Sequence, residues 1–91
     1  MTWVQHQISI PASFYTILTA YCPANTYAVS GACGIQSSVA AQPQFTVNYS
    51  GPDFDNHLDS QGRPTTWLCR LTNTSSNSQI AIYGVGCKAG Q

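Results

Sequence analysis

The stretch from Thr65 to Lys88 constrains the fold more than any other part of this chain. β-Branched and aromatic residues flank a polar cluster at residues 73–78. This pattern predicts two strands, Trp67–Thr72 and Gln79–Cys87, joined as a hairpin by a turn. A hairpin alone is only marginally stable in water, so its apolar positions need a second layer of structure.

The small size of the chain and its four cysteines point to a disulfide-stapled domain. We expect residues 1–91 to form a single domain, and a chain this short buries only about two-thirds of its unfolded surface. Two disulfides would each add about 2–4 kcal/mol to its stability. The cysteine spacing contains no C-x-x-C or paired Cys/His motif, which disfavours a structural zinc site. Disulfides predict an oxidising, extracellular location.

Charged residues make up only 7% of the chain, against roughly 25% in ordinary globular domains. Ser, Thr, Asn and Gln supply the polarity instead, with 32 of the 91 residues. A neutral surface offers no basic patch to phosphates, so nucleic acid is not an expected partner. The longest apolar runs fall far short of the ~20 residues that span a bilayer, so we expect no membrane insertion.

The N-terminal segment, residues 3–10, alternates between apolar and polar residues, which predicts a half-buried strand. His6 falls on the apolar side, where we expect a neutral, hydrogen-bonded ring. Trp3 falls on the polar side, where it could contact another subunit or a sugar, or cap a sheet edge. In the C-terminal half, we expect Trp67 to belong to the core.

Further strands are predicted at Phe14–Cys22, Tyr27–Cys33 and residues 45–49, with a loop at 36–42. Turn signals recur at regular intervals, and no helical periodicity stands out. The sequence therefore predicts an all-β fold, a small antiparallel β-sandwich or barrel of about six to seven strands.

Several short motifs from Ala20 onward carry a resemblance to known proteins. These are the turn Cys22-Pro23-Ala24-Asn25-Thr26, the strand Trp67-Leu68-Cys69 and the terminal strand Tyr83-Gly84-Val85-Gly86-Cys87. They resemble small β-domains at the ends of bacterial secreted or surface proteins and phage tail-fibre proteins. Ser30-Gly31-Ala32 departs from the glycine run that is usual before the second cysteine. The resemblance implies an extracellular, non-enzymatic module at the tip of a larger fibre.

Four cysteines allow three disulfide pairings, and the sequence alone does not choose among them. The resemblance implies Cys22 with Cys87 and Cys33 with Cys69. Locality would favour the pairs Cys22–Cys33 and Cys69–Cys87. In a tight hairpin, however, Cys69 would lie four or five residues from the position opposite Cys87, so the local pairing needs a bent strand.

The longest irregular stretch, residues 50–64, is the candidate ligand site. Its candidate ligand-binding residues combine acceptors, donors and an aromatic ring: Asp53, Phe54, Asp55, Asn56, His57, Asp59 and Arg63. A sugar hydroxyl both donates and accepts, so this mixture suits a polyol better than an anion. If the loop binds a glycan, Asp55→Ala and His57→Ala should weaken binding.

The same loop has two other interpretations. Asp53, Asp55, Asn56 and Asp59 could offer oxygen ligands to Ca²⁺, but His57 stands where the EF-hand pattern needs a third ligand and no Glu closes the loop. The carboxylates are also typical of residues that simply form turns. No cofactor is therefore expected, and no G-x-S-x-G motif supports an enzyme.

Three functions remain compatible with the sequence. The first is a receptor-binding or adhesin-like module that recognises a cell-surface glycan. The second is a structural cap or homotrimerisation domain of a fibre, suggested by low charge and a high apolar content. The third is a small secreted toxin or inhibitor, which the lack of strong charge disfavours.

Overall fold

A computed structural model of the chain describes residues 1–36 and 45–90, and it contains strands and no helix in these ranges. The six strands are β1 (Thr2–Ile10), β2 (Tyr15–Tyr21), β3 (Thr26–Gln36), β4 (Phe45–Pro52), β5 (Thr66–Asn73) and β6 (Gln79–Ala89). Every strand pair is antiparallel. The prediction of an antiparallel all-β chain is confirmed. The predicted loop at 36–42 lies outside the described residues, apart from Gln36 at the end of β3.

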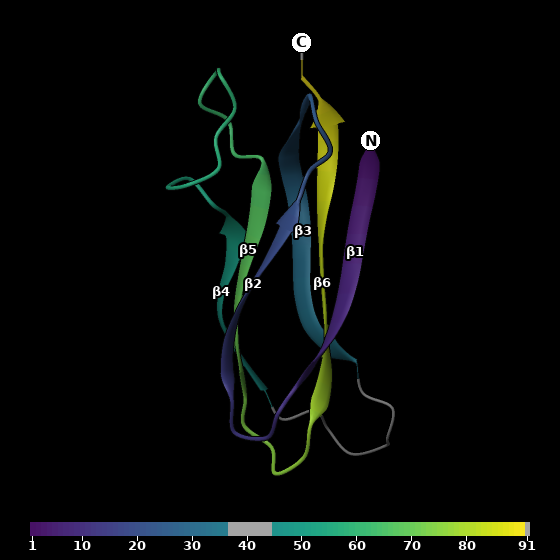
Figure 1. Cartoon of the computed structure of the whole chain (residues 1–91), viewed down its shortest axis with the longest axis vertical. Coiled ribbons are helices and arrows are strands. Elements are labelled where there is room, and N and C mark those ends of the chain that lie inside the picture. The colour runs from purple at the N-terminus through teal and green to yellow at the C-terminus, as the bar shows by residue number, and fades with distance from the viewer. Residues whose placement is uncertain (37–44, 91) are drawn as a thin grey trace.

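The strands form two three-stranded sheets, ordered β1-β6-β3 and β2-β5-β4. Figure 1 shows them as two layers that run side by side along the long axis of the molecule. Neither sheet closes into a barrel within the part of the chain that the structure describes.

The predicted hairpin between residues 67 and 87 is wrong. β5 is the central strand of one sheet and β6 is the central strand of the other, so the turn between them crosses from layer to layer. The residue types indicate that both segments are strands. They do not specify which strands pair, because the alternating apolar side chains can be buried equally well in a hairpin or in two separate sheets. Of the described strands that follow one another in the chain, only β4 and β5 pair.

Asn73 holds this crossing in place from a fully buried position. Its Nδ2 donates hydrogen bonds to Ile10 O and Pro11 O, both at 3.1 Å, and to Asn77 O at 2.9 Å. Its Oδ1 accepts from the main-chain N–H of Ser75 at 2.9 Å and from Ser75 Oγ at 2.7 Å. One amide therefore joins the β1–β2 turn to the β5–β6 turn and leaves none of its polar groups unpaired.

The core lies between the sheets and draws on both of them. One buried cluster consists of Ile10, Leu18, Cys69, Leu71 and Ala81. A second consists of Ala20, Ala28, Val85 and Cys87. Trp67 packs against both clusters, as expected for a core residue, and its Nε1 donates to Ser50 Oγ at 3.1 Å.

The two disulfides also cross between the layers. Cys22, after β2, is bonded to Cys87 of β6, and Cys33 of β3 is bonded to Cys69 of β5. This is the pairing that the resemblance implied, and the local alternative does not occur. Cys69 and Cys87 lie on strands of different sheets, which removes the geometry on which the local pairing depended.

β1 is a strand, as predicted, but it is less buried than the predicted half-buried strand. Only Ile10 is buried and Val4 is half-buried, while its other side chains are exposed. His6 is exposed, with its ring centroid 5.4 Å from that of Tyr83. β1 is an edge strand of its sheet, and most of its apolar side lies beyond the cover of the second layer. Trp3, half exposed, lies on the outer side over Gly84.

Candidate functional site

The candidate site lies at one end of the two layers. The loop between β4 and β5 (residues 53–65) projects there, and the turn between β2 and β3 (residues 22–25) and the last residues of β6 reach the same end (Figure 1). A cleft of about 490 Å³ separates these segments. This volume lies within the roughly 300–1,000 Å³ of small-molecule sites. Its lining residues are Cys22, Pro23, Ala24, Asn25, Thr26, Asp59, Ser60, Gln61, Arg63, Thr65 and Gly90.

Asp59 organises the wall of the cleft that the loop supplies. Its Oδ1 accepts hydrogen bonds from the main-chain N–H groups of Gln61 at 2.9 Å and Arg63 at 2.8 Å. Its Oδ2 pairs with Arg63 Nε at 2.8 Å. The hydrogen bond from the Arg63 main chain is the largest cause that lowers the pKa of Asp59 below its ordinary value. Aspartate is therefore required here as an ionised turn-forming residue.

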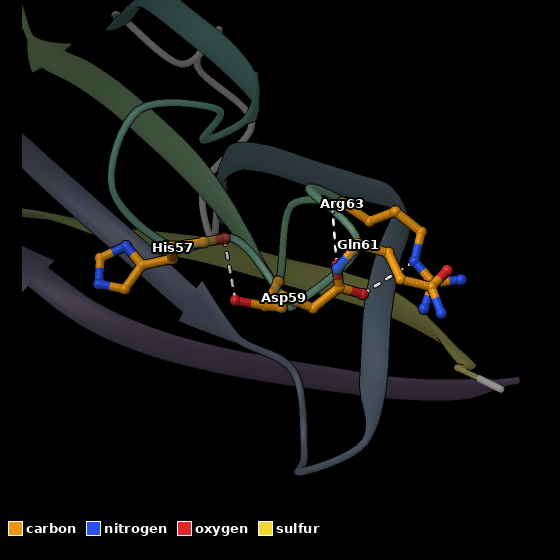
Figure 2. Close-up of polar contacts among 5 residues, drawn as sticks. His57, Asp59, Gln61 and Arg63 are labelled. Atoms are coloured by element: carbon orange, nitrogen blue, oxygen red, sulfur yellow. Dashed lines mark hydrogen bonds and ion pairs between the residues drawn. The ribbon is translucent and has the colours of Figure 1, made fainter.

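Arg63 is held on two sides. Its guanidinium carbon lies 4.0 Å from the centroid of the Tyr27 ring, in a cation–π contact, while Nε is bound to Asp59. Figure 2 shows the Arg63 side chain extended alongside Asp59, with the His57 ring pointing away from this pair. Because the two charges are paired, the cleft is polar but close to neutral, which suits an uncharged ligand.

Asp53 organises the other half of the loop. It is buried, and its Oδ1 accepts the main-chain N–H of Asp55 at 3.0 Å. This bond lowers the pKa of Asp53, against the raising effect of burial, and Asn56 and His57 lower it further. His57 Nδ1 lies 3.6 Å from Asp53 Oδ2, and the His57 ring meets the Tyr21 ring edge-on at a centroid distance of 5.4 Å.

The loop therefore divides the predicted site residues into two groups. Asp59 and Arg63 line the cleft. Asp53 and His57 form a separate contact, and the lining does not include them. Phe54, Asp55 and Asn56 are exposed in the first turn of the loop, also outside the lining. The seven predicted site residues therefore do not form one cluster. One turn centred on Asp53 and another centred on Asp59 fold the loop into two halves.

Sequence reasoning missed the opposite wall of the cleft, which the β2–β3 turn supplies. Asn25 adopts a φ of 67°, in the left-handed region that asparagine tolerates. Its main-chain carbonyl accepts the N–H of Gly90 at 2.9 Å, which ties the C-terminal end of β6 to the turn. The Cys-Pro-Ala-Asn signal indicates a turn there, but nothing in it indicates that the turn faces residues 59–63.

Within the described ranges, no group of three or more His, Cys, Asp or Glu side chains could hold a metal ion. Those ranges also contain no helix that is long and apolar enough to cross a membrane. The chemistry that the cleft presents is hydrogen bonding by amides, hydroxyls and main-chain groups. No protein family, curated protein or solved structure matches the chain.

Proposed function

We propose that the protein is a non-enzymatic, extracellular binding module that recognises a cell-surface glycan in the cleft between residues 22–26 and 59–63. The two packed sheets are, in this proposal, a small β-sandwich that presents its ligand site on the loops at one end. Disulfides that cross between the layers suit a protein that works outside a reducing cytosol.

The observation that carries the proposal is the neutral polar lining of the cleft. Asp59 and Arg63 neutralise each other, while Asn25 and Ser60 present an amide and a hydroxyl. The side chains of Asn25 and Ser60 have no hydrogen-bond partner among the described residues, so both are free to bind a ligand. Groups that donate and accept around a neutral cleft match the hydroxyls of a sugar.

The test is a glycan array probed with the parent protein and two pairs of variants. Asn25→Gly and Ser60→Ala remove cleft side chains, and glycine keeps the left-handed backbone at position 25. Phe54→Ala and Asp55→Ala are matched controls in the exposed first turn of the same loop. Loss of a ligand hydrogen bond costs about 1–3 kcal/mol, so each cleft variant should bind about five- to a hundredfold more weakly, with an unchanged melting temperature.

The controls should bind like the parent. If Phe54→Ala or Asp55→Ala weakens binding while the cleft variants do not, the site is the exposed turn at residues 54–56, in the part of the predicted loop that lies outside the cleft. If the parent binds no glycan, the proposed function is wrong.

A structural cap or trimerisation domain of a fibre is the second candidate. It is favoured by a row of exposed apolar side chains on the outer side of the β2-β5-β4 sheet: Tyr15, Ile17, Tyr21 and Tyr49. Light scattering on the isolated chain tests it, since a trimer at micromolar concentration would support this candidate.

A further inference from the structure

Among the residues that the structure describes, β1 has a free edge along its full length. It pairs with β6 on one side, from Thr2 opposite Cys87 to Ile10 opposite Gln79, and has no described strand on the other. A free edge presents a row of unpaired main-chain N–H and C=O groups, which can pair with another strand.

β1 also lacks the features that normally protect an edge. Its nine residues, TWVQHQISI, contain no proline and no Asp, Glu, Lys or Arg, and its register with β6 is uninterrupted. Two of the other edges are protected by a bulge, between Ala28 and Ser30 in β3 and between Val47 and Tyr49 in β4. The last edge, β2, is uninterrupted but has seven residues.

The side chains of β1 are left uncovered on both sides. Trp3 is 50% exposed on the outer side, and Ile8 is 45% exposed on the side that faces the second layer. β2 differs, because its inward side chains Leu18 and Ala20 are already buried. A strand added beside β1 would therefore cover apolar surface on both faces of the sheet, whereas one added beside β2 would cover only the outer face.

We propose that two copies of this chain pair through β1, antiparallel and related by a two-fold axis at His6. This register matches all nine residues of β1 with those of the second copy. It places Val4 opposite Ile8 of the other copy on the inner side. On the outer side it places Gln5 opposite Gln7 and leaves the small Ser9 opposite Trp3. The two His6 side chains lie opposite each other at the axis, no Asp, Glu, Lys or Arg side chain takes part in the pairing, and the result is one six-stranded sheet across the dimer.

The register gives a charge-swap test at Gln5 and Gln7. Both side chains are exposed, and their neighbours on β6 are Gly84 and Ile82, so charges at these positions meet no charge on β6. Gln5→Lys with Gln7→Lys places like charges opposite each other twice across the two-fold axis. Gln5→Lys with Gln7→Glu places opposite charges there instead.

Sedimentation equilibrium on the full chain measures the outcome. The parent should be a dimer at micromolar concentration, the double-lysine variant should dimerise about tenfold or more weakly, and the Lys/Glu variant should regain the parent's affinity. Ile17→Lys, an exposed position on β2, should leave the dimer intact, and circular dichroism should show that all variants fold. A monomeric or trimeric parent, a double-lysine variant as tight as the parent, or dissociation by Ile17→Lys would each overturn the proposal.

Discussion

The indole ring of Trp67 lies directly against the main chain of Gly31, on the opposite sheet. A Cβ atom on Gly31 would overlap this ring, so the contact depends on the absence of a side chain. Trp67 fills the space between the two core clusters, and Gly31 provides the room that it needs.

Gly31→Ala should therefore destabilise the protein. Overpacking of this kind costs about 1–3 kcal/mol, because neither the ring nor the two disulfide-linked sheets can move away easily. Gly34→Ala is the matched control, since a methyl group added at this position of the same strand would have no neighbour within 4 Å. It should be neutral or stabilising by roughly 0.5–1 kcal/mol. Urea unfolding of both variants measures the difference, and equal effects would contradict this account of Trp67.

Asn73→Ala should destabilise the protein because it leaves the carbonyls of Ile10 and Pro11 without their donor. A buried group that loses its partner costs about 1–3 kcal/mol. Asn77→Ala is the control, since only main-chain groups of Asn77 take part in the network. If thermal unfolding shows the same melting temperature for Asn73→Ala and Asn77→Ala, Asn73 does not hold the crossing between the layers.

Reduction should lower the melting temperature strongly, while salt should change it little. The disulfides span 65 and 36 residues, and each contributes about 2–4 kcal/mol. The one contact in the described ranges between two permanently charged side chains is Arg63–Asp59, which is partly exposed, and such a pair contributes about 0–1 kcal/mol. Calorimetry with and without reductant, at low and high NaCl, compares the two effects, and a larger shift with salt would refute this ranking.

Acid should loosen the loop between β4 and β5. The pKa values of Asp53 and Asp59 are both below the ordinary value of 3.8 in the folded protein. Their ionised forms therefore stabilise the fold above that value, and this contribution is lost as the pH falls through the lowered pKa values. Hydrogen exchange at the Gln61 and Arg63 amides should accelerate relative to the β5 amides below about pH 4. Asp59→Asn should remove most of this pH dependence, and an unchanged dependence would show that Asp59 is not its source.

The strand content was predictable from sequence because each strand carries its own local signal. The alternation in residues 67–72 and 79–87 correctly marked β5 and β6. Their pairing was not predictable, because it is accompanied by contacts between residues that are distant in sequence. The buried Asn73 amide, for example, bonds Ile10 and Pro11, which lie more than 60 positions away. A polar cluster in a sequence looks the same in a hairpin turn and in a crossing between layers.

The candidate site was predictable only in part, for a related reason. Most of the predicted loop at residues 50–64 is a loop, although residues 50–52 are the end of β4, and Asp59 and Arg63 line the cleft. The division of the loop follows from the hydrogen bonds that Asp53 and Asp59 accept from nearby main-chain groups, and a list of residue types does not reveal these. Asn25 and Gly90 reach the cleft from segments far from the loop in sequence.

An NMR titration of the ¹⁵N-labelled parent protein with the strongest ligand from the glycan array locates the binding site on the chain. We expect amide shifts to concentrate on both walls of the cleft, at Asn25, Ser60, Gln61 and Gly90. The amides of Phe54, Asp55 and Asn56 should stay unchanged. Shifts confined to residues 54–56 or to the outer face of a sheet, with none in the cleft, would contradict a glycan site in the cleft.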